Sequence, residues 1–458
     1  MNRLVDIFVR WRCHSVVFHT DVQKMYNSIK LDSSHWGLQR YLWQDSLDPS
    51  KPPEEKIIKT LIYGIKSSGN QAERGLRETA RLQGEYPEIH QIVSNDIYVD
   101  DCLSGTTDVS KVQSIADDLE VVVNHGGFTL KGFTFSGQNP QEALSSDGHS
   151  VAVAGLKWFP LEDEISLDVQ DLNFAKKSRG RKPMLVSSVP SNLTRRQCVA
   201  KVAELYDITG LITPIVATMK LDLRDLVRRR MDWDDVLPDN LRNLWQDHFE
   251  LMKEIKQIKY QRAVVPEDAA NLDIQTLDFG DASKNLICVA IYVRFKKKDG
   301  LFSCQLIFGR SKLISEEYTQ PRAELFAAMI NSHSGQTIKQ ALKDRHKSSL
   351  KFTDSQISLY WICNLNLSLK QWTRNRVSEI HRFTDVSQWK YINSDDMIAD
   401  LGTRRCTSID DVNQDSNWIK GFQWMQGELS SFPAHTAADI SLSAQEKQHL
   451  KKESREEV

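Results

Sequence analysis

The 458-residue sequence predicts a multidomain protein of mixed helices and strands, with both α+β and α/β character. The length exceeds what one ordinary hydrophobic core holds, so we expect two or three domains. Short runs of β-branched and aromatic residues alternate with amphipathic helical patterns in the first part of the chain. From residue 276 onward, three successive strands give way to a helix, which is typical of a mixed sheet.

The first domain is expected over residues 1–160. A helix is predicted over 2–13 and a strand over 15–22, where valine and phenylalanine cluster. Helices are predicted over 70–83 and 109–125, because apolar residues recur there at helical spacing, and a pair of glycines ends the second helix. Two further strands are expected over 128–135 and 151–159, with a polar loop over 136–149 between them.

Two adjacent acids, Asp100 and Asp101, lie between two short apolar runs in residues 95–105. This pattern predicts a strand, a tight turn and a second strand. Two carboxylates at the tip of a hairpin repel each other, and a divalent cation would remove that repulsion. The residues of the turn alone leave two interpretations open, a metal-binding turn and an ordinary solvated Asp-Asp turn.

Asp21 is the best upstream partner for these two acids. It ends the predicted strand over 15–22 and precedes a helix expected to begin near Lys24, so it is placed to face a neighbouring hairpin. Three carboxylates on adjacent strands can hold two Mg²⁺ ions roughly 3.5–4 Å apart, which orient an attacking 3′-hydroxyl and a leaving pyrophosphate. Nucleotidyl transfer needs little more than such positioning and charge neutralisation.

The second domain is expected over residues 161–265 and should be basic and largely helical. Helical patterns cover 194–230, broken near Gly210 and Pro214, and also 238–258. The stretch 173–230 holds 13 lysines and arginines but only four acids, which suits a track along a phosphate backbone. A solvated linker with one basic helix face remains the alternative, and a loop is expected at 176–192.

The third domain, over 266–408, should contain a mixed sheet, and residues 409–458 should form a C-terminal extension. The predicted strands are 277–281, 286–295, 303–309, 349–354 and 388–392, with a helix over 321–333 after the third of them. The end of the chain, 441–458, is charged and poor in aromatic residues, so we expect a frayed helix or disorder there.

Four acids in this third domain form a second candidate site. Asp281 and Asp354 come at the ends of predicted strands, and Glu324 lies in the predicted helix; the fourth acid, Asp400, follows the last strand. Strand ends and one helix can gather such side chains at one edge of a mixed sheet, where they would hold two Mg²⁺ ions and activate water against a phosphodiester. Arg404 and Arg405 follow closely and are expected either to contact phosphate or to have a capping or solvated role.

Composition and charge exclude several classes of protein. The net charge of -2 excludes a polycationic nucleic-acid binder. No apolar run reaches the roughly 20 residues of a membrane span, and the charged N-terminus lacks the apolar stretch of a signal peptide. The seven cysteines form no Cys-x-x-Cys pair, which argues against a zinc knuckle and a disulfide framework. We therefore expect an intracellular protein, cytoplasmic or nuclear, with no membrane partner.

An ordered series of motifs resembles the reverse transcriptases of the Pao/BEL group of LTR retrotransposons. The series covers nearly the whole chain and consists of Phe-His-Thr-Asp-Val-Gln-Lys-Met-Tyr-Asn-Ser-Ile (18–29), Tyr-Gly-Ile-Lys-Ser-Ser (63–68), Tyr-Val-Asp-Asp (98–101), Gly-Gly-Phe-Thr-Leu-Lys (126–131), Gly-Leu-Lys-Trp (155–158), Leu-Thr-Arg-Arg (193–196) and Asn-Arg-Val-Ser-Glu-Ile (375–380). The resemblance implies a truncated reverse-transcriptase palm over 1–160, a thumb and connection over 161–265, and an RNase H-like domain over 266–408.

The resemblance also implies roles for individual residues. Asp21, Asp100 and Asp101 match the metal carboxylates of the polymerase, and Asp281, Glu324, Asp354 and Asp400 match those of the nuclease. The remaining matches surround the nucleotide: Tyr26 would crowd a ribose 2′-hydroxyl, Tyr63 and Gly64 would form the nucleotide-pocket turn, and Lys131 would lie near the triphosphate. By residue type alone, Tyr26 and Tyr63 also fit core aromatics, and Lys131 fits a solvated lysine.

By this resemblance the protein would be an RNA-directed DNA polymerase with RNase H-type hydrolysis, with two Mg²⁺ ions (or Mn²⁺) per site. Its partners would be an RNA template, a DNA primer, an RNA–DNA hybrid, dNTPs and other parts of a pol polyprotein, in a virus-like particle if the element is active. Only 20 residues precede Asp21, where the family has its fingers, so we expect little primer extension by this chain alone. A polymerase-inactive relic that binds nucleic acid and a standalone RNase H-type nuclease remain the alternatives.

Overall fold

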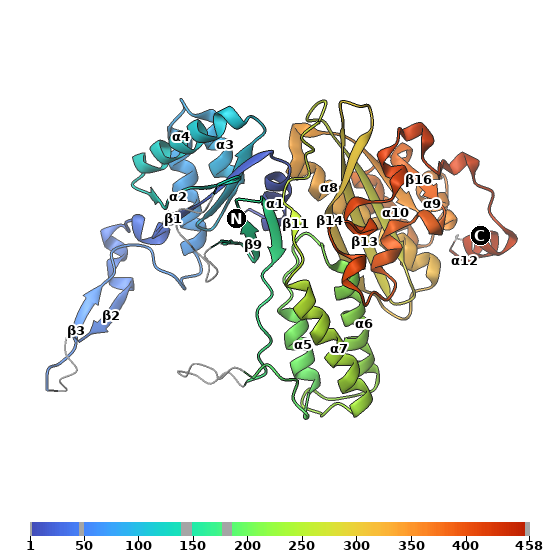
Figure 1. The fold of residues 1–458 in the computed structure, drawn as a ribbon, viewed down its shortest axis with the longest axis horizontal. Helices are drawn as coiled ribbons and strands as arrows, with labels where there is room; N and C mark the ends of the chain where they lie inside the picture. The colour runs from blue at the N-terminus through green and yellow to red at the C-terminus, as the bar shows by residue number, and fades with distance from the viewer. Residues whose placement is uncertain (1, 45–49, 139–148, 176–185, 454–458) are drawn as a thin grey trace. The chain divides into compact units, whose positions relative to one another are not determined.

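The computed structural model describes residues 2–44, 50–138, 149–175 and 186–453. The chain forms two compact units: unit 1 is 1–154 with 160–162, and unit 2 is 155–159 with 163–458. Figure 1 shows helices and strands in both units. The mixed α+β fold class predicted from the sequence is confirmed. None of the helices in the described ranges is long and apolar enough to cross a membrane.

Unit 1 is built on an antiparallel sheet whose central strand is β1 (Val16–Gln23). On one side β1 pairs with β5 (Asp101–Thr106), which in turn pairs with β4 (Ile97–Tyr98). On the other side β1 pairs with two short strands, β6 (Thr129–Leu130) and β7 (Thr134–Phe135). The predicted strand over 128–135 is thus split in two, and the short strand β8 (Val151–Val153) also belongs to this unit.

Helices of unit 1 pack against this sheet, and the last three of them share one core with it. They are α1 (Leu4–Arg12), α2 (Ser68–Leu82), α3 (Pro87–Asn95) and α4 (Val112–His125). Ala72, Leu76 and Leu119 are 1% exposed, and they join Phe18 of β1 in one apolar cluster. Burial of such side chains is worth about 1.5–3 kcal/mol for each large one, so this cluster fixes the helices against the strands that carry the acids.

A two-stranded hairpin of unit 1 lies apart from this core. It consists of β2 (Arg40–Trp43) and β3 (Glu54–Ile57), with Arg40 opposite Ile57. All four residues of β2 are exposed, and Leu42 is 70% exposed. Figure 1 shows the hairpin extending away from β1. Residues 45–49, in the connection between the two strands, lie outside the described residues.

Unit 2 begins with a small antiparallel sheet and three helices. The sheet is β9 (Leu156–Phe159), β10 (Glu164–Leu167) and β11 (Tyr260–Gln261). The helices are α5 (Arg195–Ala203), α6 (Thr213–Arg228) and α7 (Asp239–Ile255), and α5 starts with a capping box of Thr194 and Gln197. The break that the sequence predicts near Gly210 and Pro214 separates α5 from α6, while most of the loop expected at 176–192 lies outside the described residues.

The main sheet of unit 2 has six strands in the order β14-β13-β12-β15-β16-β17. Their bounds are β12 (Ile274–Ala282), β13 (Leu286–Lys296), β14 (Phe302–Leu313), β15 (His346–Thr353), β16 (Trp389–Ile392) and β17 (Ala434–His435). The first three strands are antiparallel, whereas β15 runs parallel to β12 and to β16. Because parallel neighbours end at the same edge, the carboxyl ends of β12 and β15 meet.

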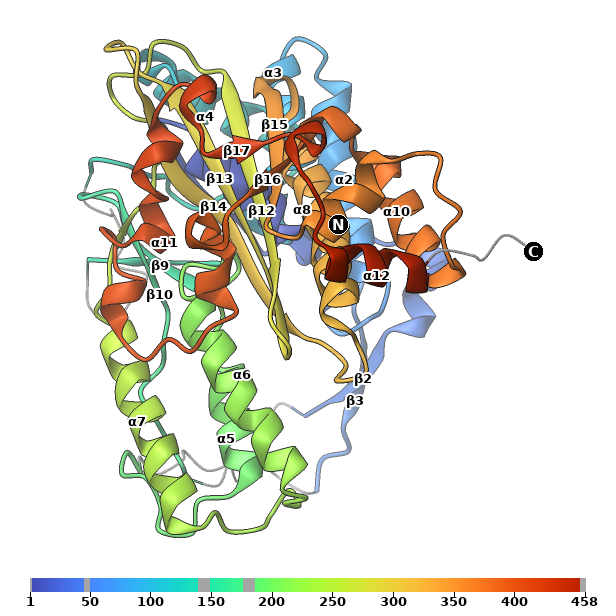
Figure 2. The ribbon, with the colours of Figure 1, turned by 90° about the vertical axis from the view of Figure 1, so that its right-hand side faces the viewer.

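Helices flank this sheet, and Figure 2 shows α8 and α10 on one side of the strands and α11 on the other. Their bounds are α8 (Gln320–Leu342), α9 (Gln356–Cys363), α10 (Gln371–Phe383), α11 (Asn417–Lys420) and α12 (Ala444–Glu453). The segment after residue 408 is tied into the unit, because buried Trp418 donates to the carbonyl of Gly210 at 3.0 Å and buried Tyr292 donates to the carbonyl of Trp418 at 2.7 Å.

Candidate active sites

The first acid cluster lies where β1 and β5 pair in unit 1. Asp21 on β1 and Asp101 on β5 are direct Cα partners in the antiparallel register. The backbone N–H of Val22 donates to the carbonyl of Asp100 at 2.8 Å, which holds the turn against the end of β1. The structure therefore brings Asp21, Asp100 and Asp101 together.

The turn that carries Asp100 has an unusual backbone. Tyr98 pairs with Asp101, so Val99 and Asp100 form a two-residue hairpin loop. Val99 has a φ of 57°, in the left-handed region that β-branched residues rarely adopt. Two-residue hairpin loops commonly require positive φ, usually supplied by glycine or asparagine. A valine here costs on the order of 1–3 kcal/mol, which the surrounding packing must offset.

Two basic side chains contact these acids. Lys131 Nζ lies 3.0 Å from Asp21 Oδ1, and the buried His19 Nε2 lies 3.2 Å from Asp101 Oδ1. Burial is the largest effect that raises the pKa of Asp100, and the charges of Asp21 and Asp101 raise it further. The hydrogen bond to Asp21 raises the pKa of Lys131. The cluster thus has excess negative charge that one lysine partly neutralises.

The predicted nucleotide-pocket residues lie beside this cluster. The rings of Tyr26 and Tyr63 are 4.4 Å apart between centroids, and they differ in exposure, at 8% for Tyr26 and 65% for Tyr63. Burial, followed by the charge of Asp100, raises the pKa of Tyr26, so its hydroxyl lies close to the acid turn. Gly64 has a φ of 88°, a conformation in which an L side chain is strained.

The second acid cluster lies at the carboxyl edge of the main sheet in unit 2. Asp281 is the next-to-last residue of β12, and Asp354 directly follows β15. Phe279 and Phe352 are Cα partners in these parallel strands. Each acid lies two residues after one of them, so the two acids reach the same level of the sheet. The other two acids come from flanking elements, since Glu324 lies in the first turns of α8 and Asp400 lies in the short 3₁₀ helix η7 (Ile398–Gly402).

The charges in this cluster confirm that its members are close to one another. Burial, followed by the charge of Asp354, raises the pKa of Asp281 to about 7. Burial also raises the pKa of Glu324 to about 7, with further contributions from Asp354 and Asp281. The pKa of Asp354 is raised by burial and by Asp400. Like charges that are withdrawn from water and crowded together disfavour ionisation, so the cluster would gain from a cation.

Hydroxyl groups contact all four acids, and the sequence alone did not identify any of these partners. Thr403 Oγ1 donates to Asp281 Oδ2 at 2.6 Å and lies 3.3 Å from Asp400 Oδ1. Ser394 Oγ donates to Asp354 Oδ2 at 2.8 Å, and Ser355 forms a hydrogen bond with Glu324. The only local signal was position, because Ser355 directly follows one acid and Thr403 comes three residues after another.

The two arginines after Asp400 are engaged with carboxylates of the protein itself. Arg404 forms an ion pair with Asp400, whereas Arg405 pairs with Asp222 on α6. Both arginine side chains are more than half exposed, at 69% and 56%. Both arginines thus form ion pairs within the protein, and the expectation that they contact phosphate or have a capping or solvated role stays a prediction.

Much of the basic stretch has internal partners as well. Lys220, Arg224 and Arg228 recur every four residues along one face of α6, and they contact β14 and the loops beside it. Arg196 pairs with Asp234, and Lys201 with Glu204. Five further basic residues of the stretch lie in 176–185, outside the described residues. In the described part, Lys220, Arg224 and Arg228 thus join α6 to β14 and its loops, whereas Lys201 forms a local pair.

Both acid clusters fit divalent cations by the chemistry of their donors. In the part of the chain that the structure describes, no three His, Cys, Asp or Glu side chains are arranged to hold a metal ion as placed. The donors are nevertheless carboxylate oxygens, which Mg²⁺ prefers. In each cluster a side-chain cation, Lys131 on Asp21 and Arg404 on Asp400, occupies a position beside a carboxylate where a metal ion would compete with it.

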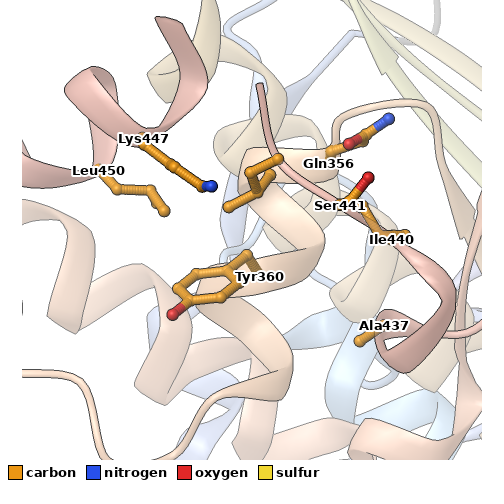
Figure 3. Close-up of a pocket in the computed structure, with 8 residues that line it drawn as sticks. Gln356, Tyr360, Ala437, Ile440, Ser441, Lys447 and Leu450 are labelled. Carbon is orange, nitrogen blue, oxygen red and sulfur yellow. The ribbon is translucent and has the colours of Figure 1, made fainter. Parts of the chain in front are cut away.

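A pocket of about 340 Å³ lies elsewhere in unit 2 (Figure 3). It is formed by α9 and the C-terminal segment, and its lining residues include Gln356, Tyr360, Ile440, Lys447 and Leu450. None of the four acids of unit 2 lines it. The concave space in Figure 3 is therefore separate from the acid cluster, and it holds no candidate catalytic residue.

Comparison with known families identifies a match within unit 2. Residues 194–355 match the family model described as "Pao retrotransposon-like RNaseH-like domain". The predicted resemblance to Pao-type retrotransposon proteins is thus confirmed over this segment. The match begins at the capping residue of α5 and ends just after Asp354, so it includes three of the four acids of unit 2 and crosses residue 265 without a break.

Comparisons with curated proteins and with solved structures add no further family match. No curated protein matches the chain. One similar solved structure is described as the "Structure of the foamy viral protease-reverse transcriptase in complex with RNA/DNA hybrid", with 10% sequence identity and a TM-score of 0.48. The alignment covers 85% of this chain and 45% of that chain, so this chain spans less than half of the foamy viral protein's length.

Proposed function

We propose that unit 2 is an RNase H-type nuclease that hydrolyses the RNA strand of an RNA–DNA hybrid. The observation that carries this proposal is the meeting of Asp281, Glu324, Asp354 and Asp400 at one edge of the mixed sheet, within and just beyond the family match. The raised pKa values of Asp281, Glu324 and Asp354 indicate a charge cluster that a structural role would not require.

In this proposal the four acids would hold two Mg²⁺ ions, which supply charge neutralisation at the attacked phosphate and activation of water. The hydroxyls of Thr403 and Ser394 hold the carboxylates of Asp281 and Asp354 in fixed orientations. Burial, with the charges of Asp354 and Asp281, raises the pKa of Glu324 to about 7, and a bound cation would favour its ionised form. Arg404 compensates the charge of Asp400, a carboxylate that would otherwise be available to a cation.

The expected substrate is a hybrid duplex, because nucleases with such acid clusters read backbone shape and 2′-hydroxyls rather than base sequence. The test uses one end-labelled RNA strand, presented as a hybrid, as an RNA duplex and alone. We expect Mg²⁺-dependent cleavage of the hybrid, little cleavage of the other two, and none in EDTA. Equal cleavage of all three substrates would instead indicate a contaminating ribonuclease or an enzyme without hybrid preference.

We propose that unit 1 carries the nucleotidyl-transfer centre of an RNA-directed DNA polymerase. The supporting observation is that Asp21, Asp100 and Asp101 meet on β1 and a strained hairpin turn, with Lys131 on the first of them. The three acids would hold two Mg²⁺ ions, Tyr26 would pack against the ribose, and Tyr63 and Gly64 would border the nucleotide. Lys131 would neutralise charge on the triphosphate.

Two assays separate this proposal from a polymerase-inactive relic. The first measures Mg²⁺-dependent binding of a dNTP to the full chain in the presence of primer and template, which an intact centre supports and a relic does not. The second measures extension of an oligo(dT) primer on poly(rA), which an active centre supports and a relic does not. Nuclease activity without any dNTP binding would favour the standalone-nuclease alternative.

The chain would act as part of a retrotransposon pol protein. In that setting, unit 1 would provide the palm, residues 161–265 would provide the thumb and connection, and the sheet of unit 2 would provide the nuclease. Its partners would then be an RNA template, a DNA primer, dNTPs and other parts of the pol polyprotein. Co-purification of the chain with other pol segments from cells that express the whole element tests this assignment.

A further inference from the structure

We propose that residues 403–406 form a positioning segment, which we call the Thr403–Cys406 segment, and that Asp222 on helix α6 anchors it so that the acids Asp281 and Asp400 are correctly placed. Arg405 and Asp222 are positioning residues in this account, since neither would touch substrate or metal. The inference rests on the proposed nuclease function of unit 2; it adds Asp222, which no motif in the sequence indicates, and gives Arg405 a role other than phosphate contact.

Each of the four residues in the segment contacts a different partner, three through the side chain and Cys406 through its backbone N–H. Thr403 donates to Asp281 at 2.6 Å, and Arg404 pairs with Asp400. The next two residues face helix α6 instead: the guanidinium of Arg405 binds both carboxylate oxygens of Asp222 at 3.1 and 2.5 Å, and the backbone N–H of Cys406 donates to Thr218 Oγ1 at 2.7 Å. One half of the segment thus contacts the acid cluster and the other half contacts α6.

The anchor on α6 is rigid. Asp222 is 3% exposed, and it also binds His248 Nε2 of helix α7 at 2.7 Å. Burial alone would raise the pKa of Asp222, but the hydrogen bonds from His248 and Arg405 lower it overall, so the carboxylate stays ionised. Thr218 is fully buried on the same helix. An ionised buried carboxylate with two fixed partners holds a bidentate arginine in one place.

The acid side of the segment is less well fixed without this anchor. Asp400 lies in the 3₁₀ helix Ile398–Gly402, whose last turn is closed by hydrogen bonds from the N–H groups of Thr403 and Arg404 to the carbonyl of Asp400. Such short 3₁₀ turns have weak hydrogen bonds of their own. Metal sites require ligands held to within about 0.5 Å by neighbouring residues. Releasing Arg405 would therefore loosen Thr403 and Asp400 together.

The competing interpretation is that Arg405 contacts nucleic acid, because its side chain is 56% exposed. The two interpretations predict different losses. A positioning role predicts weaker metal binding with unchanged affinity for the hybrid. A phosphate contact predicts weaker affinity for the hybrid, with a reduced dependence on salt and unchanged metal binding.

The experiment measures both quantities on the full chain with Arg405→Gln, Asp222→Asn and Arg405→Lys. The matched control is Arg228→Gln, because Arg228 also joins α6 to the sheet region, through a pair with Glu316, and contacts neither Asp222 nor the acid cluster in the hydrogen bonds it forms. Metal binding is read directly by titrating Mn²⁺ and Mg²⁺ against the thermal unfolding temperature and by calorimetry. Hybrid affinity is measured in EDTA, and circular dichroism verifies that each variant is folded.

We expect Arg405→Gln and Asp222→Asn to raise the half-saturating metal concentration by roughly tenfold, as substitutions next to ligands commonly do. Arg405→Lys keeps one contact and should restore part of the affinity, while hybrid affinity in EDTA and the Arg228→Gln control should stay within about twofold of wild type. Unchanged metal affinity in folded Arg405→Gln overturns the inference, as does a loss confined to hybrid affinity.

Failure of this inference is distinguishable from failure of the proposed function. A wild-type chain that binds Mg²⁺ and cleaves hybrid, together with unaffected Arg405→Gln, overturns only the positioning role. If the wild-type chain binds metal but does not cleave, the proposed function fails, and the metal titration of Arg405→Gln still decides the positioning role. A wild-type chain that binds no divalent cation overturns both.

Discussion

Thr403 donates a hydrogen bond of 2.6 Å to Asp281, a residue 122 positions earlier in the chain. Thr403→Val removes the donor but keeps the shape of the side chain, so the carboxylate loses a partner at a cost of about 1–3 kcal/mol. We expect the half-saturating Mg²⁺ concentration for hybrid cleavage to rise roughly tenfold. Thr403→Ser keeps the hydroxyl and serves as the control. Equal metal dependence of the valine and serine variants would contradict this role of Thr403.

Gly210 sits where the loop before α6 meets strand β14. Its φ is +83°, and an added Cβ would lie 2.1 Å from the carbonyl oxygen of Gly309. Gly300 provides a matched control, because its φ is +89° but an added Cβ would meet nothing within 4 Å. We expect Gly300→Ala to lower the free energy of unfolding by about 1–2 kcal/mol from backbone strain. Gly210→Ala adds a backbone clash, so we expect a loss of roughly 3 kcal/mol or more in urea denaturation. Similar losses in the two variants would show that the loop moves aside.

The ion pair of Asp222 and Arg405 predicts a specific dependence of stability on pH. Because the folded state lowers the pKa of Asp222, its contribution is present above the pKa of the unfolded chain and is lost as the pH falls through the folded pKa. The unfolded value is about 3.9, so the difference in free energy of unfolding between wild type and Asp222→Asn should be constant near neutral pH and shrink below about pH 4. Urea denaturation of both proteins across this range measures it. A difference that stays constant into strong acid would show that burial, and not charge, determines the effect.

Tyr26 is buried beside Asp100, and in the proposed polymerase centre its ring would limit the space next to a bound ribose. Replacing it by valine should admit ribonucleotides, so we expect the preference of unit 1 for dTTP over rUTP to fall by roughly tenfold, equivalent to about 1.4 kcal/mol. Competition binding with the two nucleotides in the presence of primer and template measures this ratio. Tyr41→Val is the control, because Tyr41 is 43% exposed on the hairpin strand β2. If the affinity ratio of the two nucleotides is unchanged in Tyr26→Val, Tyr26 does not select against the ribose 2′-hydroxyl.

The strands and acids were predictable because their signals are local. Apolar runs and their ends located β1, β12, β13, β14 and β16, and five of the seven acids lie at strand ends or in a turn, whereas Glu324 lies in α8 and Asp400 in η7. Helix α3 was missed, although Pro87 at its first position is a recognised start signal. The strand signals of the hairpin β2–β3 were missed as well, because both strands are exposed and lack an alternating pattern.

Tertiary contacts account for the remaining differences. The prediction ended the helix of unit 2 at residue 333, but α8 continues to Leu342. Gly335 lies within it, where an added Cβ would be 2.3 Å from Asp278 Oδ2, so the glycine makes room for the buried pair of Asp278 and Lys351. The basic stretch was equally ambiguous, because a sequence shows the charge of Arg224 or Arg228 but not the carbonyl or carboxylate that each one contacts.

The proposed nuclease centre of unit 2 requires its four acids to bind metal ions together, and Asp354→Asn tests that requirement. This substitution removes one charge from the centre, while Asp299→Asn makes the same change in an exposed turn of the same unit, next to Lys297. The measurement is the rate of Mg²⁺-dependent cleavage of an RNA–DNA hybrid by the wild type and both variants. We predict at least a hundredfold loss in Asp354→Asn, about 2.7 kcal/mol or more of transition-state stabilisation, and a wild-type rate in Asp299→Asn. Equal rates for the wild type and Asp354→Asn would contradict that requirement.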